Sequence, residues 1–514
     1  MSITSLDART GEAVAEVAGE TDPAEVSAIC RRAAAVSAEL ERLGRHRRAA
    51  MLSAMADALE ERRSEIVGLA DRESALGEAR LNGELTRTCF QLRFFAEVIA
   101  DGSYLEATID HAGDTAMGPR PDLRRILRPL GPIAVFGASN FPLAFSVPGG
   151  DTASALAAGC AVVVKAHDAH PATSLACFEA LSEGARRSGV EQPAVSLVFG
   201  LAAGVALVGD PAIRAVGFTG SLAGGRHLFE LASRRPSPIP FYGELGALNA
   251  VVVAPDAAAA RGGEIAGGLA SSFTLGVGQF CTKPGLVLLP HGPAGDELRD
   301  GLAAAVGGLP AGLMLSERIA AAFSSGRAAL AAEDGVRVVA EGAAPAAGPG
   351  WWGVPLLLEA DDPAAIDGAL GEECFGPVLA VLRYGDVEEL RSLLARLTPA
   401  LTATVHADPG DDALVAPLLE ELSGLAGRLV WNGYPTGVAV AWAMHHGGPY
   451  PATTDPLHTS VGATAIRRWL RPVSYQNVPE RLLPAELRDE PVAEHRVPRR
   501  VDGRLVLPVV PAES

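Results

Sequence analysis

The sequence predicts an α/β protein of more than one domain, on three observations. The chain has 514 residues, enough for about two to four folded units at roughly 150 residues each. Apolar residues make up 48% of the chain and charged residues 20%, a composition typical of globular domains. From residue 123 onward, short apolar runs alternate with helical stretches, the pattern of parallel sheets with helices on both faces. Ligands of such sheets bind at the carboxyl ends of the strands.

The first half of the chain predicts a helical region followed by one such sheet. Ala, Leu, Arg and Glu recur at helical spacing over 23–40, 45–63 and 92–100. The expected strands are apolar runs at 126–130, 131–137, 161–166, 194–200 and 215–220. The expected helices between them are 151–158, 171–187 and 222–234. Asp151 is the expected N-cap of the first of these helices and Gly159 its stop.

The second half predicts a further α/β domain. Its expected strands are 249–255, 285–290, 377–384, 401–407 and 427–432, and its expected helices are 264–274, 317–332 and 387–397. The Gly- and Pro-rich segment 341–355 is expected to be a surface connection. Beyond residue 471 the sequence pattern is irregular and predicts extended chain. Extended segments of this kind need another surface to pair with.

Charge and cysteine usage narrow the class of protein. Sixty-one acidic and 43 basic side chains give a net charge of −18, which argues against a nucleic acid as partner. The sequence shows no secretory leader and no run of about 18 apolar residues, so we expect neither export nor a membrane span. The six cysteines lack a CxxC pair, which favours reduced thiols over disulfides or a zinc site. We therefore expect a cytoplasmic enzyme.

A dinucleotide site is predicted from a lysine and a glycine-rich turn. Lys165 and Lys283 are the only lysines among the 43 basic residues, so each is a candidate for a task that arginine cannot perform. Lys165 ends an expected strand, and the turn 217–225 joins an expected strand to a helix, where Ser221 and free amides suit a pyrophosphate. Neither GxGxxG after the first strand nor GxxxxGK[ST] is present. The turn alone is more often plain structure, but the two features together favour a dinucleotide.

Cys281 is the candidate nucleophile. Most lone cysteines are small buried hydrophobes. Here Gly276 and Gly278 permit close backbone approach, Lys283 supplies a nearby cation, and the segment is a turn. Such surroundings lower the pKa of a thiol. No GxSxG elbow offers a serine instead.

Other polar residues suggest the rest of a catalytic site. Glu244 lies in an apolar strand-like segment between glycines, where desolvation suits a general base, although a surface or ion-paired role is the alternative. Asn140 follows an expected strand and is placed either to stabilise an oxyanion or to cap a turn. The histidine pairs at 167 and 170 and at 445 and 446 lack a metal-binding motif, so we expect structural histidines and no metal.

These residues fall in motifs that resemble the aldehyde dehydrogenase superfamily, in order and in register. The motifs are Asn140-Phe141-Pro142, Val164-Lys165, Phe218-Thr219-Gly220-Ser221, Glu244-Leu245-Gly246, Gly278-Gln279-Phe280-Cys281-Thr282 and Glu373-Cys374-Phe375-Gly376-Pro377. The longer segments 131–174, 217–229, 274–288, 432–440 and 446–472 are similar to the α-ketoglutaric semialdehyde (2,5-dioxopentanoate) dehydrogenase branch. The resemblance covers nearly the whole chain.

The resemblance implies a reaction and its catalytic residues. Cys281 is expected to attack the aldehyde carbon, while the Asn140 side chain and the Cys281 amide hold the oxyanion. Hydride transfer to NAD or NADP then leaves a thioester, which water activated by Glu244 hydrolyses to the acid.

The resemblance also assigns cofactor residues and domains. Lys165 and Glu373 are expected at the riboses and Phe375 beside the nicotinamide, with a phosphate turn formed by Gly220, Ser221 and Gly225. Residues 1–107 and 129–245 are the expected Rossmann-like cofactor domain and 246–441 the catalytic domain. Residues 108–128 and 472–495 are the expected β-arm for oligomerisation, which pairs across a homodimer or homotetramer.

Departures from the family pattern bear on specificity. Asp168 repels a 2′-phosphate and thus favours NAD over NADP, which many close relatives use. Lys283 stands where relatives often carry an uncharged residue, and we expect it either to bind an acidic substrate or to lower the pKa of Cys281. Arg93 is a second candidate for the substrate carboxylate.

Three alternatives to a semialdehyde dehydrogenase remain open at this point. A fatty or general aliphatic aldehyde dehydrogenase would suit the apolar segment 439–444. A catalytically idle cofactor-binding scaffold is the alternative from another class. A thiol hydrolase fits Cys281 and Glu244 but leaves the dinucleotide features unexplained.

Overall fold

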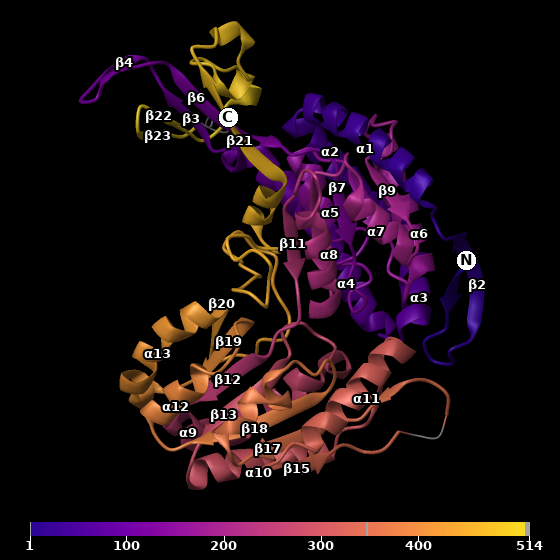
Figure 1. Ribbon diagram of the computed structural model, residues 1–514, viewed down its shortest axis with the longest axis vertical. Helices are drawn as coiled ribbons and strands as arrows, with labels where there is room; N and C mark the ends of the chain where they lie inside the picture. The colour runs from indigo at the N-terminus through magenta and orange to yellow at the C-terminus, as the bar shows by residue number, and fades with distance from the viewer. Residues whose placement is uncertain (1, 346–347, 509–514) are drawn as a thin grey trace, which may run out of the picture.

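The computed structural model describes residues 2–345 and 348–508, whose strands form two large α/β sheets and an extended arm (Figure 1). The first sheet carries the N-terminal half, the second lies below it in the view of Figure 1, and the arm projects from the top. No helix among these described residues is long and apolar enough to cross a membrane.

The chain begins with a hairpin and four helices that pack around the first sheet. The hairpin consists of β1 (Ser2–Leu6) and β2 (Ala13–Gly19), and the helices are α1 (Pro23–Leu43), α2 (Arg45–Glu61), α3 (Arg63–Ser74) and α4 (Glu78–Asp101). Asp22 caps α1 by accepting hydrogen bonds from the amides of Ala24 and Glu25 at 2.8 and 3.0 Å. The three predicted helices are confirmed, but the hairpin was not predicted because its strands are mostly exposed and carry no apolar alternation.

The first sheet is entirely parallel, in the order β11-β10-β7-β8-β9. Its strands are β7 (Ile133–Phe136), β8 (Val162–Lys165), β9 (Val195–Val198), β10 (Ala215–Thr219) and β11 (Phe241–Glu244). The helices α5 (Gly150–Ala158), α6 (Pro171–Arg187), α7 (Leu201–Gly209) and α8 (Leu222–Ser233) connect them. The chain reverses its direction of winding between β7 and β10, so a ligand crevice opens at their carboxyl ends.

The second sheet has seven strands in the order β15-β17-β18-β13-β12-β19-β20, and all neighbours are parallel except β15 and β17. The strands are β12 (Asn249–Val253), β13 (Pro284–Pro290), β15 (Val336–Glu341), β17 (Leu356–Ala360), β18 (Val378–Tyr384), β19 (Ala400–His406) and β20 (Ala426–Trp431). The helices are α9 (Pro255–Thr274), α10 (Pro293–Gly307), α11 (Glu317–Ala331), α12 (Val387–Leu394) and α13 (Asp412–Leu425), and β14 (Gly312–Leu313) pairs with β16 (Trp352–Gly353). Only residues 245–248 separate β11 from β12, so the carboxyl edge of the first sheet meets the amino edge of the second.

Two sequence-based expectations about the first sheet are wrong. The expected strand 126–130 exists within β6 (Leu123–Pro129), but it pairs antiparallel in the arm and not in the parallel sheet. Its exposed Arg125 lies between the buried residues Arg124 and Ile126, so one face of the strand is left to solvent. Asp151 is not the N-cap of α5, because Gly149 holds that position and the Asp151 carboxylate accepts a 2.7 Å bond from Arg468. Gly159 ends α5 in the left-handed conformation, as predicted.

The arm is a sheet of the order β21-β6-β3-β22-β23, which joins strands from residues 107–129 to strands from residues 470–506. It consists of β3 (Ala107–Asp110), β6, β21 (Leu470–Gln476), β22 (Arg499–Val501) and β23 (Arg504–Val506), with the hairpin of β4 (Gly113–Thr115) and β5 (Gly118–Arg120) beyond it (Figure 1). The expected surface connection 341–355 lies partly outside the described residues, as does the end of the C-terminal tail.

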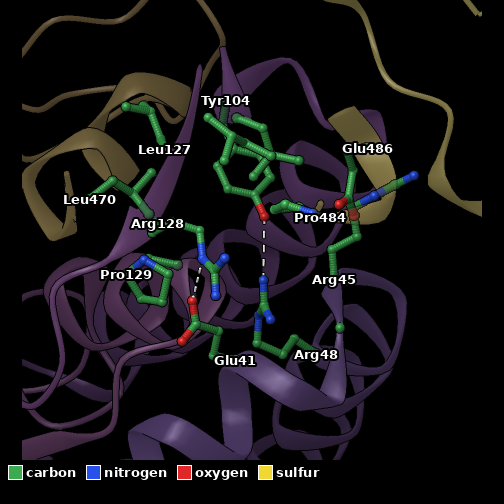
Figure 2. Close-up of a pocket in the computed structure, with 14 residues that line it drawn as sticks. Glu41, Arg45, Arg48, Tyr104, Leu127, Arg128, Pro129, Leu470, Pro484 and Glu486 are labelled. Carbon is green, nitrogen blue, oxygen red and sulfur yellow. Dashed lines mark hydrogen bonds and ion pairs between the residues drawn. The ribbon is translucent and has the colours of Figure 1, made fainter. Parts of the chain in front are cut away.

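A pocket lies where the arm meets the helices of the first sheet (Figure 2). Arg48 donates to the Tyr104 hydroxyl at 3.3 Å, and Arg128 donates to Glu41 at 2.6 Å. None of the described residues that line this pocket is among those that the sequence assigns to catalysis or cofactor binding. These bonds join α1 and α2 to the base of the arm.

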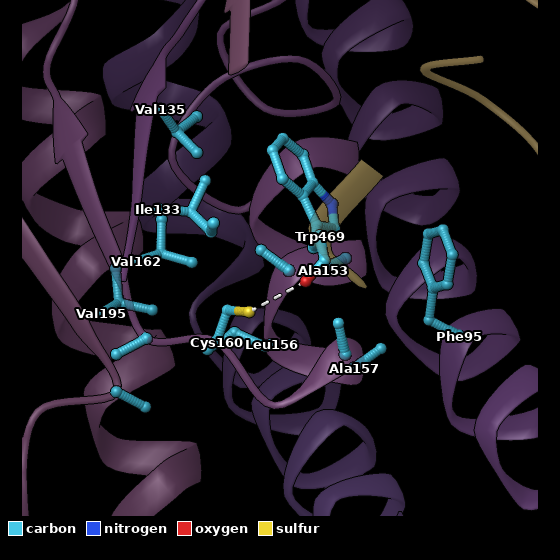
Figure 3. Close-up of a cluster of buried hydrophobic side chains, with 14 of the residues drawn as sticks. Phe95, Ile133, Val135, Ala153, Leu156, Ala157, Cys160, Val162, Val195 and Trp469 are labelled. Atoms are coloured by element: carbon cyan, nitrogen blue, oxygen red, sulfur yellow. Dashed lines mark hydrogen bonds between the residues drawn. The ribbon is translucent and has the colours of Figure 1, made fainter. Parts of the chain in front are cut away.

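Trp469 occupies the centre of the core beside the first sheet (Figure 3). Its side chain is fully buried, and its indole N–H donates to the Ser154 hydroxyl on α5 at 2.8 Å. The Arg468 guanidinium lies 4.5 Å from the Trp469 ring centroid. Because β21 starts at the next residue, this indole anchors the arm to the core.

We expect Trp469→Ala to lower the free energy of unfolding by about 3–5 kcal/mol, since it leaves a large cavity and removes the hydrogen bond to Ser154. Urea denaturation followed by circular dichroism measures the change. Met117→Ala, at a position 96% exposed, is the control and should alter stability by less than about 0.5 kcal/mol. Equal effects of the two substitutions would contradict this account of the core.

Candidate active site

The turn that carries Cys281 is held in a conformation that only glycine-rich sequence adopts easily. Gly276, Val277 and Gly278 all have positive φ angles, of 57°, 59° and 66°. A Cβ at Gly278 would lie 2.3 Å from the carbonyl carbon of Gly376. The close backbone approach predicted from the glycines is therefore confirmed, and its partner is the loop that carries Glu373 and Phe375.

Asn249 also holds the cysteine turn, and the sequence did not single it out. It starts β12, and its side-chain N–H groups donate to the backbone carbonyls of Cys281 and Lys283 at 2.9 and 3.0 Å. Its amide oxygen accepts from the Thr402 backbone and hydroxyl. A polar residue in the otherwise apolar run NAVVV was the signal that could have revealed it.

His446 and Glu244 lie together at the Cys281 thiol. The His446 Nε2 atom is 3.6 Å from the Cys281 Sγ and 3.4 Å from the Glu244 Oε1. Ser460 donates its hydroxyl to the same Glu244 oxygen at 2.5 Å. The structure thus brings together the predicted nucleophile and the predicted base. It adds His446 and Ser460, whose proximity no local pattern in the sequence reveals.

Burial sets the protonation of this cluster. Burial raises the pKa of Glu244 to about 8, against a smaller lowering by the Ser460 hydrogen bond. Burial also lowers the pKa of His446 to about 3, so its imidazole is neutral near neutral pH. The pKa of Cys281 is raised by burial and by the negative charge of Glu244. The expected lowering of the Cys281 pKa by Lys283 is therefore corrected, because the dominant influence is desolvation.

Asn140 lies against the cysteine turn from the side of the first sheet. Its side-chain N–H donates to the Gln279 carbonyl at 2.9 Å. Arg80 in turn donates to the Asn140 backbone carbonyl at 2.6 Å. The side-chain amide has a second N–H, so this placement suits the expected donor to an oxyanion near Cys281.

The predicted cofactor residues line the carboxyl edge of the first sheet. Lys165 ends β8, and its buried ammonium lies 2.6 Å from the carboxylate of the half-exposed Asp168. Ser221 caps α8 by accepting from the Gly224 amide at 3.3 Å. A Cβ at Gly225 would lie 2.2 Å from a Leu245 methyl, and one at Gly220 would lie 2.8 Å from the Phe218 ring. The turn therefore requires glycine at these two positions for packing.

Glu373 approaches the chain just beyond Glu244. A Cβ at Gly246 would lie 2.2 Å from a Glu373 carboxylate oxygen. Burial raises the pKa of Glu373 to about 7, and the charge of Lys283 acts in the opposite direction. Phe375, two residues on, is partly buried in the same loop.

The two residues expected at a substrate carboxylate are engaged elsewhere. Lys283 is buried, with 3% of its surface exposed. Its ammonium donates to the backbone carbonyls of Cys374 and Val378 at 3.2 and 2.9 Å. Arg93 lies on the outside of α4, where it pairs with Asp57 at 2.7 Å. Neither contact is directed at the Cys281 cluster.

His167 and His170 have structural surroundings. His170 is buried, with Nε2 3.0 Å from the Ala138 carbonyl and Nδ1 3.3 Å from the Ser174 hydroxyl. His167 stacks on it, and burial holds the pKa of both rings below the usual range. Among residues 2–345 and 348–508, no group of three or more His, Cys, Asp or Glu side chains is arranged to hold a metal ion.

Comparison with known proteins defines the family to which this fold and site belong. Residues 1–450 match the aldehyde dehydrogenase family, so the chain belongs to that family and is an NAD(P)-dependent oxidoreductase. The resemblance and the fold class predicted from the sequence are thereby confirmed.

Two curated relatives narrow the similarity further. The chain is 48% identical to alpha-ketoglutaric semialdehyde dehydrogenase 2 of Azospirillum brasilense over 462 residues. The aligned region covers 89% of this chain and 87% of that protein. It is 43% identical over 445 residues to alpha-ketoglutaric semialdehyde dehydrogenase of Acinetobacter baylyi, over 86% and 84% of the two chains.

Solved structures share the fold. The 3,6-anhydro-L-galactose dehydrogenase in complex with NAP superposes with a TM-score of 0.79 at 20% identity, over 92% of this chain and 96% of that one. Proline utilization A of Bradyrhizobium japonicum superposes with a TM-score of 0.76 at 24% identity, over 89% of this chain and 45% of that one.

We expect Lys283→Met to weaken cofactor binding and stability without altering the choice of aldehyde. The substitution leaves the carbonyls of Cys374 and Val378 without their donor, at a cost of about 1–3 kcal/mol. It also removes a charge that favours ionised Glu373. The melting temperature and the KM for NAD(P) measure these effects, and the ratio of kcat/KM for acidic and neutral aldehydes should stay within about twofold. A KM rise confined to an acidic aldehyde would instead place Lys283 in the substrate pocket.

Proposed function

We propose that this enzyme oxidises α-ketoglutaric semialdehyde to 2-oxoglutarate with NAD or NADP through a thioester on Cys281. The observation that carries the chemistry is the contact of Cys281 with His446, and of His446 with Glu244, between the two sheets. The substrate is supported by the 43–48% identity to two alpha-ketoglutaric semialdehyde dehydrogenases over most of the chain.

The first step is attack of the Cys281 sulfur on the aldehyde carbon. The thiol proton needs an acceptor, and Glu244 is a stronger base than the neutral His446. Formation of the carbon–sulfur bond moves an electron pair onto the aldehyde oxygen. The free N–H of Asn140 and the Cys281 amide are the donors that we assign to this oxyanion.

The second half of the reaction needs a hydride acceptor and a base. The nicotinamide supplies the hydride acceptor when the cofactor is bound. Glu244 first releases the thiol proton to solvent and then takes a proton from water, which attacks the thioester carbon. The carbon–sulfur bond breaks, the acid is released, and the proton held by Glu244 passes to the Cys281 sulfur, which restores the thiol. Since Ser460 and His446 both contact the Glu244 carboxylate, they hold it in position for this proton transfer.

The residues at the carboxyl edge of the first sheet fit a dinucleotide. Lys165 is a buried donor at the end of β8, and Gly220 and Gly225 leave no room for a side chain in the turn at Ser221. We assign Lys165 and Glu373 to the riboses, Phe375 to the nicotinamide side and the turn to the pyrophosphate. Asp168 beside Lys165 favours NAD, because a carboxylate repels a 2′-phosphate.

We also propose that the arm joins subunits in a homodimer or homotetramer. Residues 108–128 and 472–495 form most of it, while 1–107 with 129–245 and 246–441 form the cofactor and catalytic domains. The arm sheet ends in the short exposed strand β23, and the β4–β5 hairpin extends beyond it, so both offer backbone edges to a second subunit.

A fatty or general aliphatic aldehyde is the second candidate substrate. An aromatic cluster favours this candidate, because it offers apolar surface to an alkyl chain. The ring centroids of Trp442 and Phe94 are 5.9 Å apart, and those of Phe94 and Phe90 are 6.1 Å apart. Trp442 and Phe90 are each 51% exposed. Turnover of aldehydes of increasing chain length separates this candidate from the semialdehyde.

The decisive assay follows the absorbance of reduced nicotinamide with α-ketoglutaric semialdehyde and with hexanal, using NAD and NADP in parallel. We expect faster reduction with the semialdehyde and with NAD, and we expect Cys281→Ala to abolish it, because the other five cysteines, all within the described residues, are buried. Faster turnover of hexanal would favour the aliphatic candidate. Cofactor binding with no reduction of any aldehyde would point to an idle scaffold.

We expect Ser460→Ala to shift the rise of kcat with pH to higher pH by about one unit. The Ser460 hydroxyl stabilises ionised Glu244, so its loss raises the Glu244 pKa above about 8 and leaves less base at neutral pH. Ser460→Thr, which keeps the hydroxyl, is the control. A profile that does not move would exclude Glu244 as the titrating base.

A further inference from the structure

Arg87 is a partly buried cation close to the Cys281 cluster, and no step described above uses it. It lies on α4, and its guanidinium is 4.9 Å from the centroid of the Phe145 ring. The Phe145 ring is in turn 6.3 Å from the His446 ring, whose Nε2 contacts the Cys281 thiol. The positive charge of Arg87 acts on both Cys281 and Glu244.

The terminal nitrogens of Arg87 have no acceptor. Both Nη1 and Nη2 are buried, and neither makes a hydrogen bond within residues 2–345 and 348–508. The nearest acidic neighbour on the same helix, Glu84, instead accepts from the backbone amides of Leu143 and Ala144. A guanidinium buried without acceptors is costly, because its N–H groups lose water and gain nothing. An anion that enters the site would satisfy them.

The other cations near Cys281 already have acceptors. Arg428 donates Nη1 to the Gly437 carbonyl at 2.8 Å and Nη2 to the Pro435 carbonyl. Arg80 donates to the Asn140 carbonyl and lies between the rings of Phe141 and Phe280. Within the described part of the chain, Arg87 is thus the arginine near Cys281 with both terminal nitrogens unpaired.

A second unpaired donor lies one helical turn beyond Arg87. The Gln91 side-chain Nε2 is buried and has no acceptor among the described residues. It lies 2.6 Å from the position that a Cβ on Gly150 would take, next to the Ser460 carbonyl. Because residues i and i+4 share one face of a helix, Arg87 and Gln91 present their donors on the same side of α4.

We propose that Arg87, assisted by Gln91, binds the carboxylate of the substrate and selects for short acidic aldehydes. This inference rests on the proposed function, which supplies an aldehyde carbon and a carboxylate carbon four bonds apart in one molecule. With the aldehyde at Cys281, the carboxylate lies toward α4, where the planar fork of Arg87 accommodates two oxygens. A neutral aldehyde leaves the guanidinium unpaired.

The test compares Arg87→Gln with Arg93→Gln, a matched change on the same helix at the surface pair with Asp57. For Arg87→Gln we expect the KM for α-ketoglutaric semialdehyde to rise at least about tenfold, while kcat for pentanal stays within about twofold. Arg87→Lys should recover part of the loss, and Arg93→Gln should match the wild type. Equal losses on both aldehydes, or no loss on either, would overturn the proposal.

Inhibition by glutarate separates this inference from the proposed function. Glutarate carries the carboxylate but no aldehyde, so its competition with pentanal reports the anion site whatever the natural substrate is. We expect its inhibition constant to rise at least about tenfold in Arg87→Gln and to be unchanged in Arg93→Gln. An unchanged constant in Arg87→Gln would overturn the inference. Poor turnover of the semialdehyde by the wild type would overturn the proposed substrate alone. Circular dichroism checks that each variant is folded. If Arg87→Gln does not fold, the KM and the inhibition constant of Arg87→Lys test the proposal in its place.

Discussion

The close approach of two backbone segments underlies the geometry of the site. Gly278 lies so close to the Gly376 carbonyl that no side chain fits between them. This contact places the cysteine turn against the loop of Glu373 and Phe375, so one packing constraint fixes the proposed nucleophile relative to two of the proposed cofactor residues. Asn249 and Lys283 hold the same two segments through backbone carbonyls. The positive φ angles from Gly276 to Gly278 are the conformational cost of this arrangement.

Water exclusion is the second property that organises the site. Burial raises the pKa of Glu244 and lowers that of His446, so the cluster carries little charge near neutral pH. An uncharged cluster tolerates burial before substrate arrives, and Arg87 is then the group with most to gain from an anion. Desolvation thus raises the pKa of Glu244 and also makes an anionic partner for Arg87 favourable at the same site.

The sequence predicted most of the fold, because both α/β regions carry strong apolar runs. Ten predicted strands were found, with only 126–130 placed in the wrong sheet. The helices α3, α7, α10 and α13 were missed, and for α7 the reason is that its sequence LAAGVALVG has no polar face. Cys281, Glu244 and Asn140 were found from motifs, and the structure brings them together.

What sequence could not reveal were contacts made across the fold. His446 and Ser460 stand far along the chain from Glu244, and Arg87 lies on a helix that reads as ordinary structure. Lys283 was singled out correctly as unusual, but its surroundings show that its ammonium serves the backbone. The rarity of lysine in this chain identified Lys283 as a residue with a particular role. Only its tertiary contacts show that this role is to donate hydrogen bonds to the backbone.

The segment from His446 to Trp469 has an architectural consequence. It contacts the Cys281 thiol at one end, holds Glu244 through Ser460, anchors in the core at Trp469 and continues directly into the arm strand β21. The arm and the Cys281 cluster therefore share one continuous stretch of chain. An insertion that displaces the start of β21 also displaces Ser460 and the Glu244 carboxylate that it holds, so the arm cannot be exchanged independently of this cluster.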